Sequence, residues 1–353
     1  MSDRRYPRSQ LGLTLIELMI SIAIGLVVVG AVSYLYLGSR GAYRGNESLA
    51  RIQEAGRFAL DSITRDIRRS GALGCGSRVS VATGGPITVT VVPPLALAAE
   101  AIQGFKPANY TPLPTAPPSA LNPTIAPMYW GGDVLQLQIA SGAPVRVVNN
   151  PDTTNGRVTI ADNSVALFGA GDYALLGDCS AATVFKVLSA STTTSGAAAT
   201  IGFGAGASLG GDGFTIDNRA TLQHFDQITY FVGKVPSTGR SALYRYSLQD
   251  ASAGRPTPEE LVENIEDMDV VYGVDTSPGD NVLSADEFDH ADLVGAWANV
   301  ASVRVSVLAA GDQQGVGSQG QTLPFRGTTT APAGDTRLRQ VFTATAAVRD
   351  RVK

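Results

Sequence analysis

Residues 11–37 read LGLTLIELMISIAIGLVVVGAVSYLYL, and this stretch decides the fold. The 20 residues from Leu18 to Leu37 carry no charge. In a helix they would extend about 30 Å at ~1.5 Å per residue, which matches the hydrocarbon thickness of a bilayer. We therefore expect one helix that can cross a membrane.

The charges around this stretch predict its orientation. Arg4, Arg5 and Arg8 precede it, whereas the segment that follows is less densely basic. The positive-inside rule then leaves the N-terminus in the cytoplasm and everything after residue 40 on the other side. A secretory signal peptide and a plain single-pass anchor are the alternatives.

Neither alternative explains Glu17, the one acid in the stretch. A carboxylate at the centre of a membrane helix costs roughly 2.5–3.5 kcal/mol, and less near the membrane surface, so it marks a functional candidate that needs a partner. No cation lies close to it in the sequence. A plain anchor would require Glu17 to reach back to the interface.

The residues around Glu17 resemble a known signal. A short basic leader ends in Gly12, and Leu13-Thr14-Leu15-Ile16-Glu17-Leu18 follows, which is similar to the class III signal of type IV prepilins and pseudopilins. The resemblance implies that a prepilin peptidase cuts between Gly12 and Leu13 and methylates the new amino terminus. Leu13 stands where Phe is commoner. Glu17 would then attract the amine of a neighbouring subunit, because an acid and an ammonium withdrawn together from water attract strongly.

A second helical segment is predicted at residues 47–69. Its apolar and small residues form one stripe at spacings of three and four, namely Leu49, Ile52, Gly56, Ala59, Ile63 and Ile67. The glycines at 38, 41 and 45 suggest a loosened join to the membrane half, and Ser70-Gly71 supplies a stop. This amphipathic half needs a sheet to cover its stripe.

The rest of the chain has strand character. Asp133–Ile139 and Ser302–Val307 alternate apolar and polar residues, as half-buried antiparallel strands do. Further strands are expected at residues 79–92, 157–160, 184–188, 227–232, 242–247, 269–274 and 340–348. A short helix is expected at residues 258–265, and long loops at 105–127 and 190–214. We expect an α+β fold in which a long N-terminal helix packs on a large antiparallel β head, formed as one unit or as two lobes.

The two cysteines, Cys75 and Cys179, are 104 residues apart, and both would lie where disulfides persist. A bridge between them would tie the end of the helix to the head and stabilise the fold by up to roughly 4.7 kcal/mol in the chain-entropy treatment. Two buried thiols are the alternative.

Three later segments sharpen the resemblance. Residues 50–76 (ARIQEAGRFALDSITRDIRRSGALGCG), 171–185 (GDYALLGDCSAATVF) and 260–308 are similar to PilW-type minor pilins of type IV pili. Arg349-Asp350 departs from the arginine-asparagine pair expected there. The resemblance implies a pilin-like fold and four parts: a leader at 1–12, a transmembrane half at 13–37, an amphipathic half at 38–70 and a β-rich head at 71–353.

The same resemblance implies a structural role in starting pilus assembly, at or near the pilus tip. The implied partners are other minor pilins, the major pilin, the prepilin peptidase, the inner-membrane assembly platform, membrane lipid and, as a further candidate, a tip adhesin. The chain would reside in the inner membrane with a periplasmic head and later on the cell surface. A type II secretion pseudopilin, or a minor pilin for DNA uptake or adhesion, is the alternative.

The composition argues against other classes of function. The formal net charge of −4 becomes −6 when the leader is removed, so we expect no nucleic-acid partner. Two histidines, His224 and His290, leave little material for a metal centre, and no catalytic or nucleotide-binding motif is present. We expect no enzyme activity, metal or cofactor. The acidic segment at residues 275–292 lacks EF-hand spacing, which favours a solvated loop over a calcium site.

Overall fold

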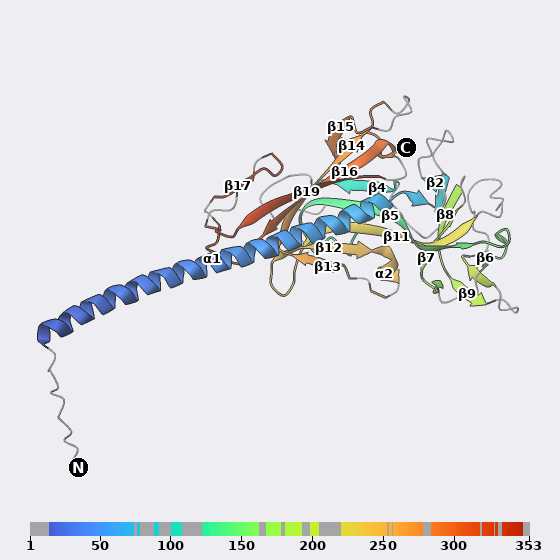
Figure 1. Cartoon of the computed structure of the whole chain (residues 1–353). Helices are drawn as coiled ribbons and strands as arrows, with labels where there is room; N and C mark the ends of the chain where they lie inside the picture. Colours follow the sequence, from blue (N-terminus) through green and yellow to red (C-terminus); the bar gives the residue numbers. More distant parts are fainter. Residues whose placement is uncertain are drawn as a thin grey trace, which may run out of the picture.

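A single long helix and a β-rich head make up the computed structural model (Figure 1). The residues that it describes are 14–73, 76–77, 88–91, 100–107, 122–161, 167–177, 181–192, 198–204, 220–252, 254–255, 257–277, 284–317, 320–327, 329–330 and 334–348. The α+β architecture expected from the sequence is confirmed.

Helix α1 extends from Leu15 to Arg69, a total of 55 residues, and its N-terminal half projects away from the head (Figure 1). It continues without a break through Gly38, Gly41 and Gly45. Each glycine costs a helix roughly 1 kcal/mol, which is less than is needed to break a helix of this length.

The C-terminal half of α1 buries the predicted stripe. Ile52, Ala59, Ile63 and Ile67 are almost wholly buried, whereas Leu49 is 37% exposed and lies off the stripe. The helix ends at Ser70, whose backbone N–H donates to the carbonyl of Ile67, and the next residue, Gly71, has a φ of +81°. The predicted stop at Ser70-Gly71 is therefore confirmed, since glycine adopts this backbone conformation without a steric penalty.

The larger sheet has eight strands, with β5 and β11 at its centre. It contains β3 (Thr88–Val91), β4 (Ile102–Phe105), β5 (Tyr129–Arg146), β7 (Tyr173–Gly177), β8 (Ala181–Lys186), β11 (Thr221–Lys234), β12 (Ser241–Ser247) and β13 (Glu259–Glu263). All its pairings are antiparallel except that of β3 with β8, which is parallel.

A second, four-stranded antiparallel sheet has the order β15-β14-β16-β19. Its strands are β14 (Ile265–Val274), β15 (Glu287–His290), β16 (Val300–Ala310) and β19 (Arg339–Ala347). The smaller elements are β1 (Ala72–Leu73), β2 (Gly76–Ser77), β6 (Arg157–Ile160), β9 (Ser189–Thr192), β10 (Ala199–Gly202), β17 (Thr322–Leu323), β18 (Thr329–Thr330), α2 (Leu248–Ser252) and a 3₁₀ turn at Trp297–Asn299.

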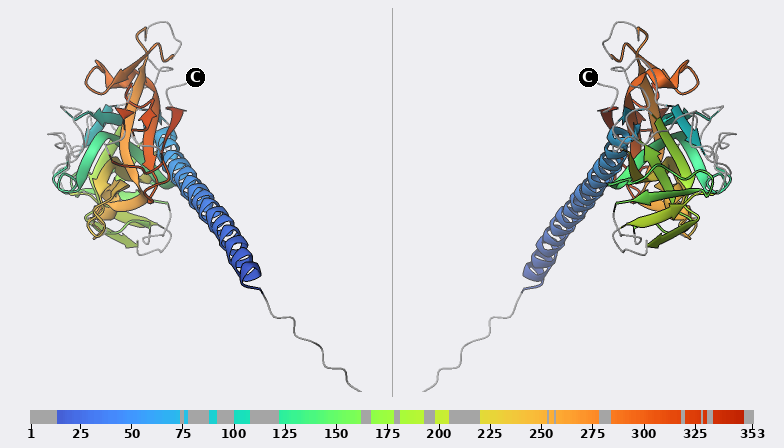
Figure 2. Two further views of the ribbon diagram at one scale, coloured as in Figure 1. Left: turned by 90° about the vertical axis from the view of Figure 1, so that its left-hand side faces the viewer. Right: turned by 90° about the vertical axis from the view of Figure 1, so that its right-hand side faces the viewer.

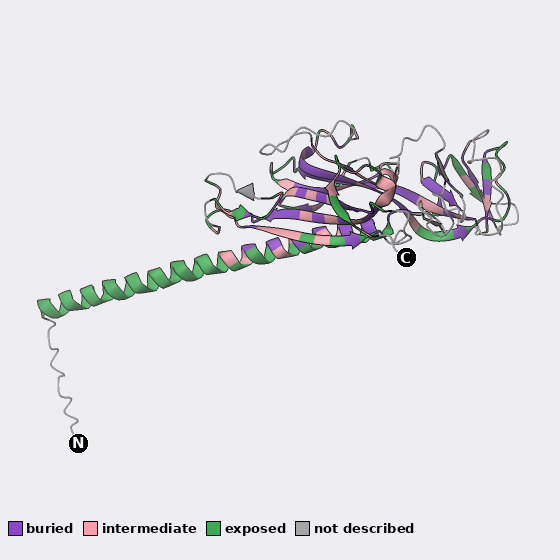
Figure 3. Ribbon diagram, turned by 90° about the horizontal axis from the view of Figure 1, so that it is seen from above, coloured by how far each residue is buried: buried purple, intermediate pink, exposed green. Residues whose placement is uncertain are grey.

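The main core lies where α1 meets both sheets. Ile63 of α1 shares one apolar cluster with Leu137 of β5, Tyr230 of β11 and Val305 of β16. A second cluster surrounds the end of β5 and the start of β11, and it includes Val147, Phe185, Ile201 and Leu222. Figure 3 shows the contrast along α1, which is exposed over its N-terminal half and buried only where it meets the head. Figure 2 shows from two further sides that the helix projects from the head.

Most of the predicted strands are found, and two sequence predictions are wrong. The helix expected at residues 258–265 is absent, since Glu259–Glu263 form strand β13 and Ile265 begins β14; pairing of β13 with β12 overrides the local preference. Residues 190–214 are not one long loop, since they contain β10 and most of β9, with Ala199 and Ile201 buried. The predicted strand at 79–92 is described only at Thr88–Val91.

Candidate assembly interface

The projecting half of α1 is the largest uncovered apolar surface among the described residues. Every side chain from Leu15 to Arg44 is exposed, and Gly45 is the first residue with partial cover. The uncovered part is about 45 Å long at ~1.5 Å per residue. The helix is long and apolar enough to cross a membrane, and its most apolar part is not buried by the rest of the chain.

Glu17 lies in the first turn of α1, at the end farthest from the head (Figure 1). Its backbone N–H donates to Oγ1 of Thr14 at 3.3 Å, and its carbonyl accepts from Oγ of Ser21 at 2.7 Å. The N-terminus of a helix carries partial positive charge, which favours an acid at this position. Glu17 is also the only charged residue between Leu15 and Ser39.

The opposite end of α1 is fixed to the head by a buried acid. Oδ2 of Asp66 accepts a 2.7 Å hydrogen bond from the hydroxyl of Tyr230 and lies 3.7 Å from the guanidinium of Arg245. Arg69, one turn later on the helix, lies 3.7 Å from the same carboxylate. Burial, reinforced by the charge of Asp66, raises the pKa of Tyr230 far above its usual range, so its hydroxyl remains a donor.

A second carboxylate extends this network into the sheet. Asp226 accepts hydrogen bonds from the hydroxyl of Ser247 at 2.7 Å and the backbone N–H of Gln249 at 3.1 Å. Arg245 lies 3.7 Å from Asp226 and so bridges the two acids. Burial raises the pKa of Asp226, and the two hydrogen bonds and Arg245 oppose that rise. The network therefore links α1, β11 and β12.

Close backbone approach complements these polar contacts. A Cβ atom placed on Gly56 would overlap the aromatic ring of Phe342 in β19. A Cβ atom on Gly311 would likewise overlap the hydroxyl of Ser48. Only glycine allows these elements to approach so closely, so the helix is fixed against the four-stranded sheet at two levels.

A second polar cluster joins the two sheets at the uncovered edge of β14. The guanidinium of Arg326 lies 2.8 Å from Asp269, 3.4 Å from Asp133 and 3.2 Å from Asp267. Asp133 also accepts from the backbone N–H of Val270 at 2.8 Å. Pairing with β15 ends at Val271, and beyond that residue these side chains hydrogen-bond to the exposed backbone edge of β14.

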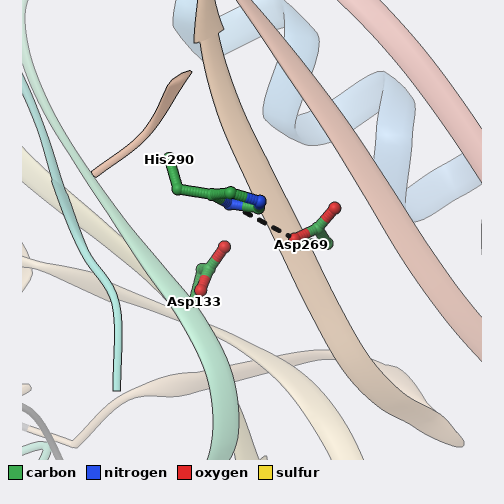
Figure 4. A group of neighbouring side chains, drawn as sticks. All are labelled: Asp133, Asp269 and His290. Carbon is green, nitrogen blue, oxygen red and sulfur yellow. Dashed lines mark ion pairs between the residues drawn. The ribbon is translucent and has the colours of Figure 1, made fainter. Parts of the chain in front are cut away.

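His290 completes this cluster, with Nδ1 3.7 Å from the carboxylate of Asp269 (Figure 4). The ligand-type atoms of Asp133, Asp269 and His290 lie within 4.8 Å of one another. Both carboxylates already pair with Arg326, so the cluster is explained as an ion-pair junction between the sheets. Burial raises the pKa of Asp267 to about 6, and the positive charge of Arg326 opposes the rise.

Of the residues that the sequence singles out, the structure describes Glu17, His224 and His290. Gly12, Leu13, Cys75 and Cys179 lie outside the described residues. Glu17 is described, and it stands alone at the far end of α1. His224 lies in β11 with its ring stacked on Phe168.

Sequence reasoning missed Asp66, Tyr230 and Arg326. Asp66 carried a usable signal, because it falls between Ile63 and Ile67 on the face of the helix that is otherwise apolar. An acid on a buried stripe needs a partner. Arg326 carried no such signal, since it lies in a turn with a φ of +48°.

Comparisons with known proteins give two family models and a solved structure. Residues 229–350 match the family model described as Type IV Pilus-assembly protein W, and residues 7–33 match that of the prokaryotic N-terminal methylation motif. The predicted resemblance to PilW-type pilins with a class III signal is confirmed. A solved type IV-like pilin from Thermus thermophilus is similar with 13% identity and a TM-score of 0.24, over 60% of this chain and 85% of that chain. No curated protein matches the chain.

Proposed function

We propose that this pilin is a minor subunit that helps to start type IV pilus assembly and occupies a position at or near the pilus tip. The observation that carries the proposal is the projecting half of α1, an uncovered apolar helix with a single acid at its start, attached to a folded head. Before assembly the helix would lie in the inner membrane with the head in the periplasm, and afterwards the protein would be on the cell surface.

The physical reason for such a role is the cost of leaving the membrane. An extracted helix exposes its apolar surface unless neighbouring helices cover it. A small complex of several such helices lowers this cost before a fibre exists. The proposed partners are therefore other minor pilins, the major pilin and the inner-membrane assembly platform, with a tip adhesin as a further candidate.

The pairing proposed for Glu17 depends on processing. Cleavage between Gly12 and Leu13 by the prepilin peptidase would create a methylated amine at Leu13 in each mature subunit. That amine of a neighbouring subunit would supply the positive charge that Glu17 lacks within its own helix. Such a pair of charges would set the register between subunits, because either charge alone is penalised in an apolar environment.

The role proposed is structural rather than enzymatic. The polar clusters of the described head are ion-pair networks that link helix and sheets, and each acid in them has a named arginine or hydrogen-bond donor. The head would serve to select partners by its side contacts.

The first experiment is intact-mass and N-terminal analysis of the protein extracted from the membranes of its native host. A mature chain that begins at a methylated Leu13 supports the proposal. A chain that retains residues 1–12, or one cut after the apolar run, contradicts it. The piliation and protein secretion of a deletion strain then distinguish a pilus subunit from a secretion pseudopilin.

The second experiment tests Glu17. Glu17→Ala should leave membrane insertion and cleavage intact while it reduces co-purification with the other pilins of the host. Glu47→Ala is the matched control, since Glu47 is also on α1 but lies beyond the apolar half. Normal piliation of the Glu17→Ala strain would count against the pairing.

A further inference from the structure

Strand β19 leaves one edge of the four-stranded sheet open. Among the described strands it pairs with β16 alone, and the register from Ser302↔Ala347 to Ala310↔Arg339 has no shift. The backbone N–H of Val348 donates to Ala301 at 2.9 Å, and the carbonyl of Leu338 accepts from Gly311 at 2.7 Å. Even-numbered residues of the strand therefore bond to β16, and odd-numbered ones point their backbone groups outward.

Among the described residues, only Arg339, the first of these outward residues, has partners for its outward backbone groups. The side-chain amide of Gln321 accepts from the N–H of Arg339 at 3.1 Å and donates to its carbonyl at 2.8 Å, as a neighbouring strand would. The next outward positions are Val341, Thr343, Thr345 and Ala347. Their outward backbone groups have no hydrogen-bond partner within the described part of the chain. A row of alternating donors and acceptors matches an extended backbone.

The open edge also lacks the features that keep edge strands apart. Residues 340–347 (QVFTATAA) contain no charge, proline or glycine, and the strand has no bulge. Edge strand β13 is different, because it carries Glu259, Glu260 and Glu263 and has an irregular register. Charges and bulges of this kind block edge-to-edge pairing. The contrast indicates that β13 is protected against pairing with another strand, whereas β19 is not.

The direction of β19 follows that of α1. Ser48 lies beside Gly311, which is bonded to Leu338, and Gly56 lies against Phe342. The eight helical residues between the first and second contact rise ~12 Å. The four strand residues between them rise about 14 Å. The strand and the helix therefore run the same way, side by side in Figure 1, and β19 begins where the projecting half of α1 leaves the head.

We infer that the outward edge of β19 accepts an antiparallel strand from a different pilin subunit. Strand β19 of a second copy does not fit, because antiparallel pairing of β19 with itself would point the two α1 helices in opposite directions. Subunits anchored in one membrane have helices that point the same way. The occupant is therefore a strand that runs opposite to its own subunit's helix. This inference rests on the proposed function, since it takes the partner from the assembly complex.

Hydrogen exchange of individual backbone amides tests the inference. The probe is the tagged full-length protein, measured alone in detergent and again in the complex that it forms with the other pilins of its host. The amides of Val341, Thr343, Thr345 and Ala347 should exchange fast in the protein alone and become protected in the complex. Fast exchange of these amides in the complex overturns the inference, and their protection in the isolated protein at high concentration overturns the choice of a different subunit.

Two substitutions at Thr343 separate the contribution of its backbone N–H from that of its side chain. Thr343→Pro removes an outward N–H that makes no bond within the sheet, so the protein should fold, and its binding to the complex should weaken roughly tenfold. Thr343→Val keeps that N–H and should bind as the wild type does. Equal binding by the wild type and both variants would refute strand addition.

The outcome is separable from that of the proposed function. If Glu17→Ala abolishes recruitment whereas Thr343→Pro has no effect on it, the role in assembly stands and the strand-addition site does not. Circular dichroism and thermal unfolding of the Thr343→Pro protein verify its fold, and Thr345→Pro repeats the test at the next outward residue.

Discussion

The hydroxyl of Tyr230 in β11 lies 2.7 Å from Oδ2 of Asp66 in α1, and 164 residues separate the two in the sequence. This bond and the ion pair between Asp66 and Arg245 help to fix the rotation of the helix on the head, together with the close packing of Gly56 against Phe342. The projecting half of α1 is thus held in one direction relative to the surfaces of the head.

Tyr230→Phe should destabilise the head by about 1.5–3 kcal/mol, because it removes a hydrogen bond to a buried charged group. The measurement is the free energy of unfolding of the full-length protein in detergent. Tyr43→Phe is the control, since Tyr43 lies in α1 with 70% of its surface exposed. A change in the Tyr230→Phe protein no larger than that of the control would show that the bond contributes nothing.

Gly56→Ala should destabilise the protein by about 1–3 kcal/mol, because the added methyl group overlaps the ring of Phe342. Gly41→Ala is the control, since a Cβ there meets nothing within 4 Å. The control should be neutral or gain up to ~1 kcal/mol from the higher helix propensity of alanine. Thermal unfolding of both proteins decides the matter, and equal midpoints would contradict the close approach of α1 and β19.

Arg326→Met should cost roughly 3–5 kcal/mol, because it leaves the carboxylates of Asp133 and Asp269 buried beside each other without their arginine. Arg255→Met is the control, since Arg255 is 74% exposed and pairs with Asp250 at the surface. That control should change stability by less than about 1 kcal/mol. Denaturant titration of the two proteins distinguishes a buried network from a superficial one.

Asp267 should make the stability depend on pH. Its pKa is about 6 in the folded protein against 3.8 ordinarily, mainly because it is buried, so the folded state holds this proton more tightly than the unfolded state. Its contribution to stability should therefore be greatest below about pH 4 and fall by roughly 2–3 kcal/mol as the pH rises through 6. The wild type should lose stability relative to Asp267→Asn between pH 4.5 and 7. No difference in slope between the two would exclude the shift.

Cys75 and Cys179 should form a disulfide in the protein extracted from its host. Intact mass before and after reduction should then differ by two hydrogens. Cys75→Ser should lower stability by about 2–5 kcal/mol, as loss of a bridge that closes a long loop does. Two alkylatable thiols in the unreduced protein would show that the cysteines are free.

The sequence determined the features that depend on neighbouring residues. The apolar run after Gly12 is enough to predict a helix of membrane length, and the period of three and four from Ile52 to Ile67 identifies the face that the head covers. Alternation likewise predicts β16, where Val303, Val305 and Val307 are buried. These patterns are local, so no knowledge of the partner elements is needed to recognise them.

Only the tertiary structure decided the features that depend on distant residues. Pairing with β12 makes residues 259–263 a strand, although their local sequence favours a helix. Asp66 meets Tyr230, and Asp133 meets Arg326, across more than a hundred residues of chain. The open edge of β19 is likewise invisible in the sequence, because a strand is an edge only by virtue of which strands the fold places beside it.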